Sequence, residues 1–136
     1  MVQIIAGVKG TGKTKKLLDL LNKSLAASNG NVVCLEKGTK LRFDVSHEAR
    51  LINTNDYCIF DGQSLFGFVS GILASDHDVT DIFVDATLKI CGDLGGFEKF
   101  VVELDELLAK NNCNVVMTIS VDPAELSDNV RKFLID

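Results

Sequence analysis

Apolar residues along this 136-residue chain occur in two patterns, short continuous runs and longer stretches with helical spacing. The continuous runs are rich in β-branched residues, which is typical of strands that are covered on both faces in a parallel sheet. They occupy residues 2–6, 31–36, 81–85 and 114–120. We expect each of these runs to form a buried strand.

The longer stretches place apolar residues three and four positions apart and charged residues between them, as amphipathic helices do. They cover residues 12–27, 61–76, 93–110 and 122–134. The last one opens on Asp122, Pro123 and Glu125, which predicts an N-cap, a proline at the first helical position and a capping box. One helix from Pro123 onward would then pack Leu126, Val130, Phe133 and Leu134 onto the sheet.

Residues 37–57 fit neither pattern and predict only loops and short extended pieces, for instance at Leu51 and Ile52. Elsewhere strands and helices alternate, which favours a three-layer α/β/α sandwich around a mostly parallel sheet of about five strands. The length suits a single domain spanning residues 1–136.

The loop between the first strand and the first helix carries the strongest chemical signal. It reads Gly-Val-Lys-Gly-Thr-Gly-Lys-Thr and fits G-x-x-x-x-G-K-[ST], the phosphate-binding P-loop or Walker A motif. Its glycines let the backbone approach an anion, and its N–H groups and the helix N-terminus attract negative charge. The predicted phosphate-binding residues are Gly7, Val8, Lys9, Gly10, Thr11, Gly12, Lys13, Thr14 and Lys15.

Two of these residues have specific predicted roles toward ATP and Mg²⁺. The Lys13 ammonium would bridge the β- and γ-phosphates and stabilise transferred charge, and the Thr14 hydroxyl would ligate the metal. The strand at residues 81–85 ends in Asp85, as a Walker B strand does. Because ligands bind outside the carboxyl ends of parallel strands, Asp85 should emerge beside the loop and share the metal with Thr14.

A catalytic base is harder to assign. Ala86 and Thr87 follow Asp85, where many ATPases of this kind place a glutamate. Glu36, at the end of the second strand, could serve as a substitute base, and Asp61 is a second option. Thr118 or Ser120 could sense the γ-phosphate, or could be core and turn hydroxyls. In the first case, as a resemblance to other P-loop proteins suggests, their strand would lie between the P-loop strand and the strand of Asp85.

Composition narrows the class of partner. The net charge of −5 argues against a nucleic-acid-binding face, because phosphate backbones require clustered basic residues. No apolar run reaches the roughly 20 residues of a membrane span, and the chain opens on a strand, so we expect a cytoplasmic protein without a signal peptide. The four cysteines show no C-x-x-C pairing and predict reduced thiols.

The motif, the Asp85 strand and the alternating element order resemble a minimal P-loop NTPase. More closely, residues 6–17 and 122–126 resemble a family of short, largely uncharacterised bacterial ATP-binding proteins that are sometimes labelled twitching-motility ATPase-like. The resemblance implies the P-loop NTPase fold and ATP binding, with hydrolysis as a further expectation. No N-K-x-D motif is visible, so ATP rather than GTP is the expected nucleotide.

The sequence therefore predicts Mg-ATP binding with slow hydrolysis. Two alternatives remain open. The chain could be a small-molecule kinase of the nucleoside or nucleotide type, with an acceptor pocket built from residues 37–62. It could also be a non-catalytic switch, in which ATP orders residues 37–57 for an unidentified protein partner.

Overall fold

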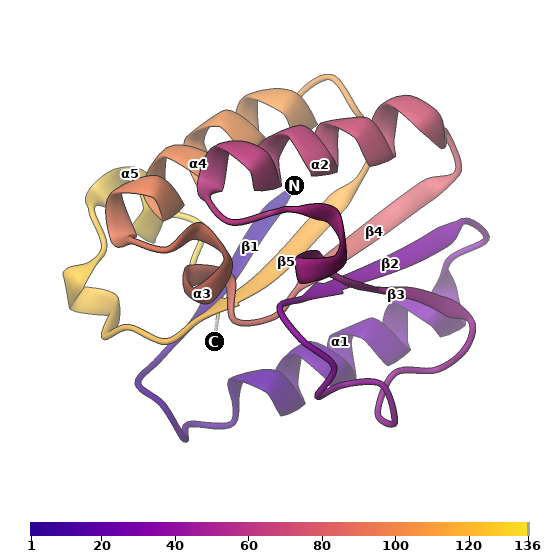
Figure 1. Cartoon of the computed structure of the whole chain (residues 1–136), viewed down its shortest axis with the longest axis horizontal. Coiled ribbons are helices and arrows are strands. Elements are labelled where there is room, and N and C mark those ends of the chain that lie inside the picture. The colour runs from indigo at the N-terminus through magenta and orange to yellow at the C-terminus, as the bar shows by residue number, and fades with distance from the viewer. Residues whose placement is uncertain (136) are drawn as a thin grey trace.

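The computed structural model, which describes residues 1–135, is an α/β structure built on one five-stranded sheet whose strands all run parallel. The strand order is β1-β5-β4-β2-β3 (Figure 1). β5, the strand of Thr118, lies between β1 and β4, which is the position suggested for a sensor strand, and the sensor role itself stays a prediction. The strands are β1 (Val2–Ala6), β2 (Asn31–Glu36), β3 (Ala49–Asn53), β4 (Val79–Val84) and β5 (Asn114–Ile119).

Helices cover both faces of the sheet. One face carries α1, and the other carries α2 and α4 (Figure 1). Two shorter helices and two 3₁₀ turns, η1 and η2, complete the connections. The bounds are α1 (Lys13–Ala27), η1 (Thr54–Tyr57), α2 (Gly62–Ser75), α3 (Thr87–Cys91), α4 (Leu94–Leu108), η2 (Pro123–Glu125) and α5 (Asp128–Arg131). This arrangement agrees with the predicted three-layer sandwich.

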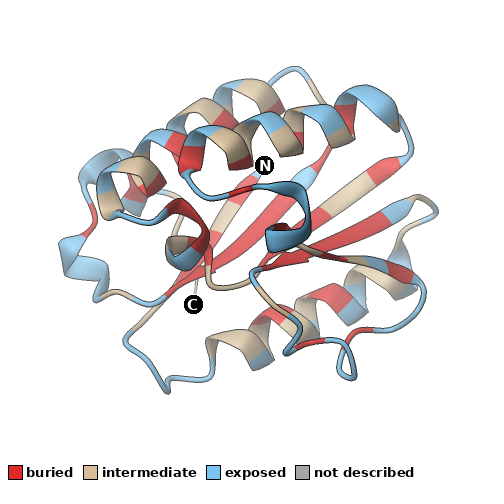
Figure 2. Ribbon diagram, viewed as in Figure 1, coloured by how far each residue is buried: buried red, intermediate tan, exposed pale blue. Residues whose placement is uncertain are grey.

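The sheet divides the core into two layers. Its central strands are largely buried (Figure 2). In β4, Ile82 and Val84 pack toward α2 and α4, whereas Phe83 packs with Leu17 and Leu21 of α1. Successive side chains of a strand point to opposite faces, so a strand covered on both sides needs apolar residues at consecutive positions. This requirement explains the continuous apolar runs in the sequence.

The predicted C-terminal helix is wrong as a single element. The predicted cap is present, since Asp122 accepts the Ala124 N–H and Glu125 accepts the Asp122 N–H. The turn that they stabilise, η2, ends after three residues. Leu126 then adopts an extended conformation and inserts into the core with 2% of its surface exposed, and a new short helix, α5, begins at Asp128. Burying Leu126 breaks the helix in two.

Residues beyond α5 pair with the sheet. The Ile4 N–H donates to the Phe133 carbonyl, and the Ile135 N–H donates to the Ile4 carbonyl. Leu134 thereby forms a parallel bridge with Ile4 at the outer side of β1. The tail therefore covers a strand edge that would otherwise present unpaired backbone groups.

Two elements were not predicted as such. β3 pairs with β2 along its whole length, from Ala49 to Asn53. α3 starts at Thr87, immediately after the loop that holds Asp85. Both are five residues long, and periodicity is a weak signal in so short a segment. Across residues 1–135, none of the helices has the length and apolar character needed to cross a membrane.

The cysteines form no disulfide in the described chain, and three of the four are buried. Burial is the main cause that raises the pKa of Cys34 and of Cys91 from 9.0 to about 12, and that of Cys113 to about 11. The charges of Asp85 and Glu36 raise the pKa of Cys34 further. Cys58 is exposed.

We predict that a thiol reagent at pH 8 modifies Cys58 rapidly in the folded protein and all four cysteines after denaturation. Spectrophotometric thiol counting measures the number of modified cysteines. Fast labelling of Cys58→Ser protein would contradict the burial of the other three.

The folded chain keeps three thiol protons that the unfolded chain loses above about pH 9. The free energy of unfolding should therefore fall as the pH rises from about 9 toward 12. Urea titrations across this pH range measure that free energy.

Candidate functional site

The loop from Gly7 to Gly12 leaves β1 in a conformation that depends on its glycines. Gly10 and Gly12 have φ values of +87° and +81°, which side chains rarely allow. A Cβ at Gly7 would lie 2.6 Å from the Thr11 hydroxyl oxygen. The Thr11 hydroxyl and the Lys13 ammonium both donate to the Val8 carbonyl, at 2.8 and 3.0 Å. The lysine thus folds back over the loop.

The N-terminus of α1 differs from those of α2 and α4 in having no carboxylate. Asp61 accepts the Ser64 N–H at the start of α2, and Asp93 accepts the Gly96 N–H at the start of α4. At α1 the N-cap is Gly12, which provides no side-chain acceptor, and no acidic residue lies in the first turn. The first N–H groups of α1 and the helix dipole are therefore available to an anion from outside the chain.

Asp85 joins this loop to the middle of the sheet. The Thr14 hydroxyl donates to the carboxylate of Asp85, with its oxygen 3.1 and 3.3 Å from the two carboxylate oxygens. The Thr118 hydroxyl of β5 donates to the same carboxylate at 2.8 Å. The Asp85 N–H donates to the Leu35 carbonyl of β2 at 2.9 Å. The expected meeting of Thr14 and Asp85 is thus present in the structure.

Ala86, directly after Asp85, occupies the left-handed region with φ 53° and ψ 53°. A side chain in this region costs free energy, and such strain concentrates at functional sites. The Ala86 N–H donates to the Thr118 hydroxyl oxygen at 2.7 Å. One buried hydroxyl therefore holds both the carboxylate of Asp85 and the strained turn that follows it. The sequence left Thr118 open as a sensor or a core hydroxyl, and the structure gives it this positioning contact.

The oxygen atoms of Thr14 and Asp85 suit a magnesium ion whose other ligands are phosphate and water. They do not suit a metal that protein side chains alone would coordinate. Mg²⁺ prefers oxygen ligands and commonly uses one or two protein groups together with phosphate oxygens and water. Within residues 1–135, no group of three or more histidine, cysteine or acidic side chains could hold a metal by itself. The donor set therefore suits a metal that arrives with a phosphate ligand.

The structure places Glu36 near this site, at the carboxyl end of β2, but both of its carboxylate oxygens accept backbone hydrogen bonds. The donors are the N–H groups of Lys40 and Leu41, at 3.2 and 2.9 Å. Only 4% of Glu36 is exposed. These bonds fix the segment that follows β2, and activation of a nucleophile by Glu36 would have to compete with them. Its role as a base stays a prediction.

The remaining candidates lie apart from the Thr14–Asp85 contact. Asp61 caps α2, and its hydrogen bonds from the Ser64 hydroxyl and N–H hold its pKa below the usual range. Ser120 is exposed at the end of β5. Neither residue contacts the loop through a hydrogen bond or an ion pair in the described chain.

A pocket of about 520 Å³ opens beside the loop, on the side of the outer edge of β1. Gly7, Gly12 and Lys13 form part of its wall, and Lys16 rather than Lys15 extends it along α1. Residues 123, 134 and 135 close it from the C-terminal segment. This wall could not be predicted from sequence patterns, because it depends on the tail pairing with Ile4, about 130 positions away along the chain.

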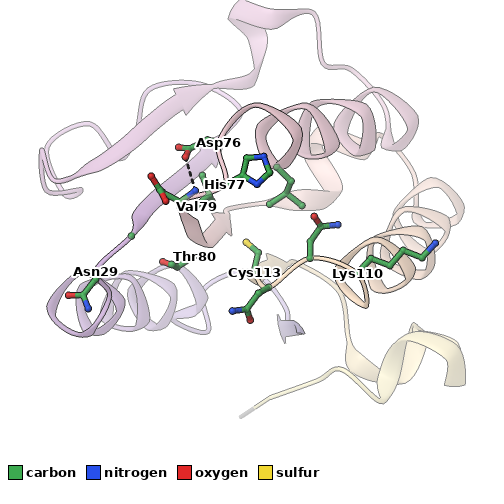
Figure 3. Close-up of a pocket in the computed structure, with 12 residues that line it drawn as sticks. Asn29, Asp76, His77, Val79, Thr80, Lys110 and Cys113 are labelled. Carbon is green, nitrogen blue, oxygen red and sulfur yellow. Dashed lines mark hydrogen bonds between the residues drawn. The ribbon is translucent and has the colours of Figure 1, made fainter.

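A second hollow of similar size lies at the opposite, amino-terminal end of the sheet (Figure 3). It is formed by the segments that precede β2, β4 and β5. Both carboxylate oxygens of Asp76 already accept hydrogen bonds, one from the Asn31 side chain and one from the Asp78 N–H. Because parallel sheets bind ligands at their carboxyl ends, the hollow beside the loop is the better candidate site.

The chain matches no protein-family model and no curated protein sequence. The residues of the loop, the Asp85 contact and the pocket are therefore the features that indicate a function.

We predict that Thr118→Val destabilises the fold by about 1–3 kcal/mol, because the Ala86 N–H loses its acceptor in a buried site while side-chain volume is conserved. Thr118→Ser keeps the hydroxyl and should lose less stability. Urea denaturation of both variants measures the difference. Equal stabilities for the valine and serine variants would show that the two hydrogen bonds contribute little.

Proposed function

We propose that this chain is a P-loop nucleotide-binding protein that binds Mg-ATP and hydrolyses it slowly. The observation that carries the proposal is the hydrogen bond between the Thr14 hydroxyl and the carboxylate of Asp85, at the start of a helix without an acidic cap. It joins the two residues predicted to hold the metal, Thr14 from the Walker A motif and Asp85 from the Walker B pattern. The five-stranded parallel sheet, with β5 between β1 and β4, is consistent with the P-loop NTPase fold.

In this proposal, the N–H groups of the loop and of the first turn of α1 bind the phosphates. Lys13 would leave the Val8 carbonyl and place its ammonium between the β- and γ-phosphates. Thr14 and Asp85 would hold magnesium, which when bound neutralises charge on the phosphate oxygens. Thr118 would keep the carboxylate of Asp85 in place through its hydrogen bond.

The proposed reaction transfers the γ-phosphoryl group to water. The water oxygen forms a bond to the γ-phosphorus, and the bond from that phosphorus to the β–γ bridging oxygen breaks. ADP leaves with the bridging oxygen, inorganic phosphate carries the oxygen of the water, and one proton passes to solvent. Lys13 stabilises the negative charge that this step concentrates on the phosphoryl oxygens.

The turnover should be slow because the two carboxylates predicted as bases, Glu36 and Asp61, are both engaged in hydrogen bonds. Ala86 and Thr87 follow Asp85, and the Thr87 hydroxyl donates to the Val84 carbonyl. Both oxygens of Glu36 accept backbone hydrogen bonds, and Asp61 caps α2. Positioning of the nucleophile is a large part of catalysis in phosphoryl transfer.

The same contacts favour the nucleotide-dependent switch as the second candidate, over the small-molecule kinase. Asp85 directly follows β4, and Glu36 ends the adjacent strand β2. The Asp85 N–H donates to the carbonyl of Leu35, next to Glu36. Glu36 in turn holds residues 40 and 41. A change at the metal site could therefore be transmitted to the segment after β2, where a protein partner would bind. A kinase would need Glu36 or Asp61 as a free base.

We predict that Lys13→Ala lowers the affinity for Mg-ATP by about 10–100-fold, because it removes a charged hydrogen bond to phosphate. Isothermal titration calorimetry measures the affinity. Lys23→Ala is the matched control, since it removes the same charge from an exposed position on α1 and should change the affinity less than about twofold. Unchanged affinity in a folded Lys13→Ala protein would contradict the proposed function.

A further inference from the structure

We propose that the pocket between the loop and the C-terminal segment binds the nucleoside part of the nucleotide, and that it does so with little discrimination between bases. The inference rests on the proposed function, since it assumes that the phosphates occupy the loop. It adds the site of the sugar and base and the selectivity to be expected there.

The position of the pocket follows from the two sides of β1. Thr14 and Asp85 mark the side of the loop that faces β5 and β4, where the metal and the terminal phosphates would lie. On its other side, β1 pairs with the segment around Leu134. The pocket opens on that side and shares Gly7, Gly12 and Lys13 with the loop. A nucleotide whose terminal phosphates lie at Asp85 would extend its sugar and base into it.

The walls of the pocket suit an aromatic ring. Pro123, Leu134 and Ile135 line the far side, and Ile5 and Ala6 line the side of β1. A volume of about 520 Å³ is within the range of about 300–1,000 Å³ found for small-molecule sites, which are mostly apolar with a few polar groups. The polar groups lie at the end nearest the phosphates, where Lys13 and Lys16 are located.

The walls are held in place by backbone contacts. Pro123 belongs to η2, which Asp122 and Glu125 cap. The tail is fixed because the Phe133 carbonyl and the Ile135 N–H pair with Ile4 on β1. The apolar wall is therefore formed before a ligand binds, which reduces the entropy cost of binding.

The scarcity of free polar groups on the pocket wall explains the low selectivity that we propose. Bases are distinguished by hydrogen bonds to their edges, and a site without such groups rejects the wrong base weakly. Among the described residues that line the pocket, the polar side chains are Thr11, Lys13 and Lys16. The Thr11 hydroxyl donates to the Val8 carbonyl, and the tail groups named above are paired with Ile4. The far wall presents apolar side chains to the base.

The test measures the binding of ATP, GTP, CTP, UTP and inorganic tripolyphosphate, each with Mg²⁺, by calorimetry. Wild-type protein is compared with Leu134→Ser and Ile135→Ser, which shorten the apolar wall and leave the loop unchanged. Val102→Ser, at an exposed position on α4, is the matched control. Thermal unfolding without ligand shows which variants are folded, and either wall variant alone is sufficient.

We expect the four nucleotides to bind within about fivefold of one another and at least tenfold more tightly than tripolyphosphate. Leu134→Ser and Ile135→Ser should each weaken ATP binding by about fivefold or more and leave tripolyphosphate binding unchanged. Val102→Ser should change neither.

Three results would overturn the inference while tripolyphosphate binding kept the phosphate site intact. The first is ATP binding that is no tighter than tripolyphosphate binding. The second is that the wall variants bind ATP as wild type does, or weaken the binding of both ligands equally. The third is a preference above tenfold for one base. Absence of binding by both ATP and tripolyphosphate would instead remove the proposed function, and the inference with it.

Discussion

The carboxylate of Asp85 is the point at which three parts of the structure meet. It accepts hydrogen bonds from Thr14 on α1 and from Thr118 on β5, while its own N–H binds β2 through the Leu35 carbonyl. The carboxylate thereby links the loop before α1, the central strands and, through Thr118, the turn at Ala86. Because charge-assisted hydrogen bonds are stronger than neutral ones, we expect these contacts to stabilise the loop.

Much of this arrangement could be predicted because it follows from local patterns and from one rule of parallel sheets. The loop motif at Gly7–Thr14 is contiguous in sequence, and the strand before Asp85 is a short apolar run. The carboxyl ends of parallel strands share one edge of the sheet, so a loop after β1 and an aspartate after β4 must lie at the same edge. The pattern therefore predicted that Asp85 would emerge beside the loop and Thr14.

The features that were missed depend on contacts between distant residues or on backbone detail. The break in the last predicted helix reflects the burial of Leu126, and the tail beyond it pairs with Ile4 near the other end of the chain. Glu36 is a plausible base by position alone, and only the structure shows that two backbone N–H groups occupy it. The left-handed conformation of Ala86 has no sequence signal, because alanine is not enriched there. The pairing of the tail with Ile4 forms the wall of the pocket, and the hydrogen bonds to Glu36 are one reason to expect slow turnover.

The proposed nucleotide site, which uses Thr14 and Asp85 with magnesium, can be tested by thermal unfolding with ATP in the presence and absence of Mg²⁺. A ligand at about 100 times its dissociation constant stabilises the native state by about 2.7 kcal/mol. For a domain of this size, that is a shift of the unfolding midpoint on the order of 8–12 °C. We predict such a shift with Mg-ATP and a clearly smaller one when EDTA removes the metal. No shift, or the same shift with and without metal, would contradict the proposed site.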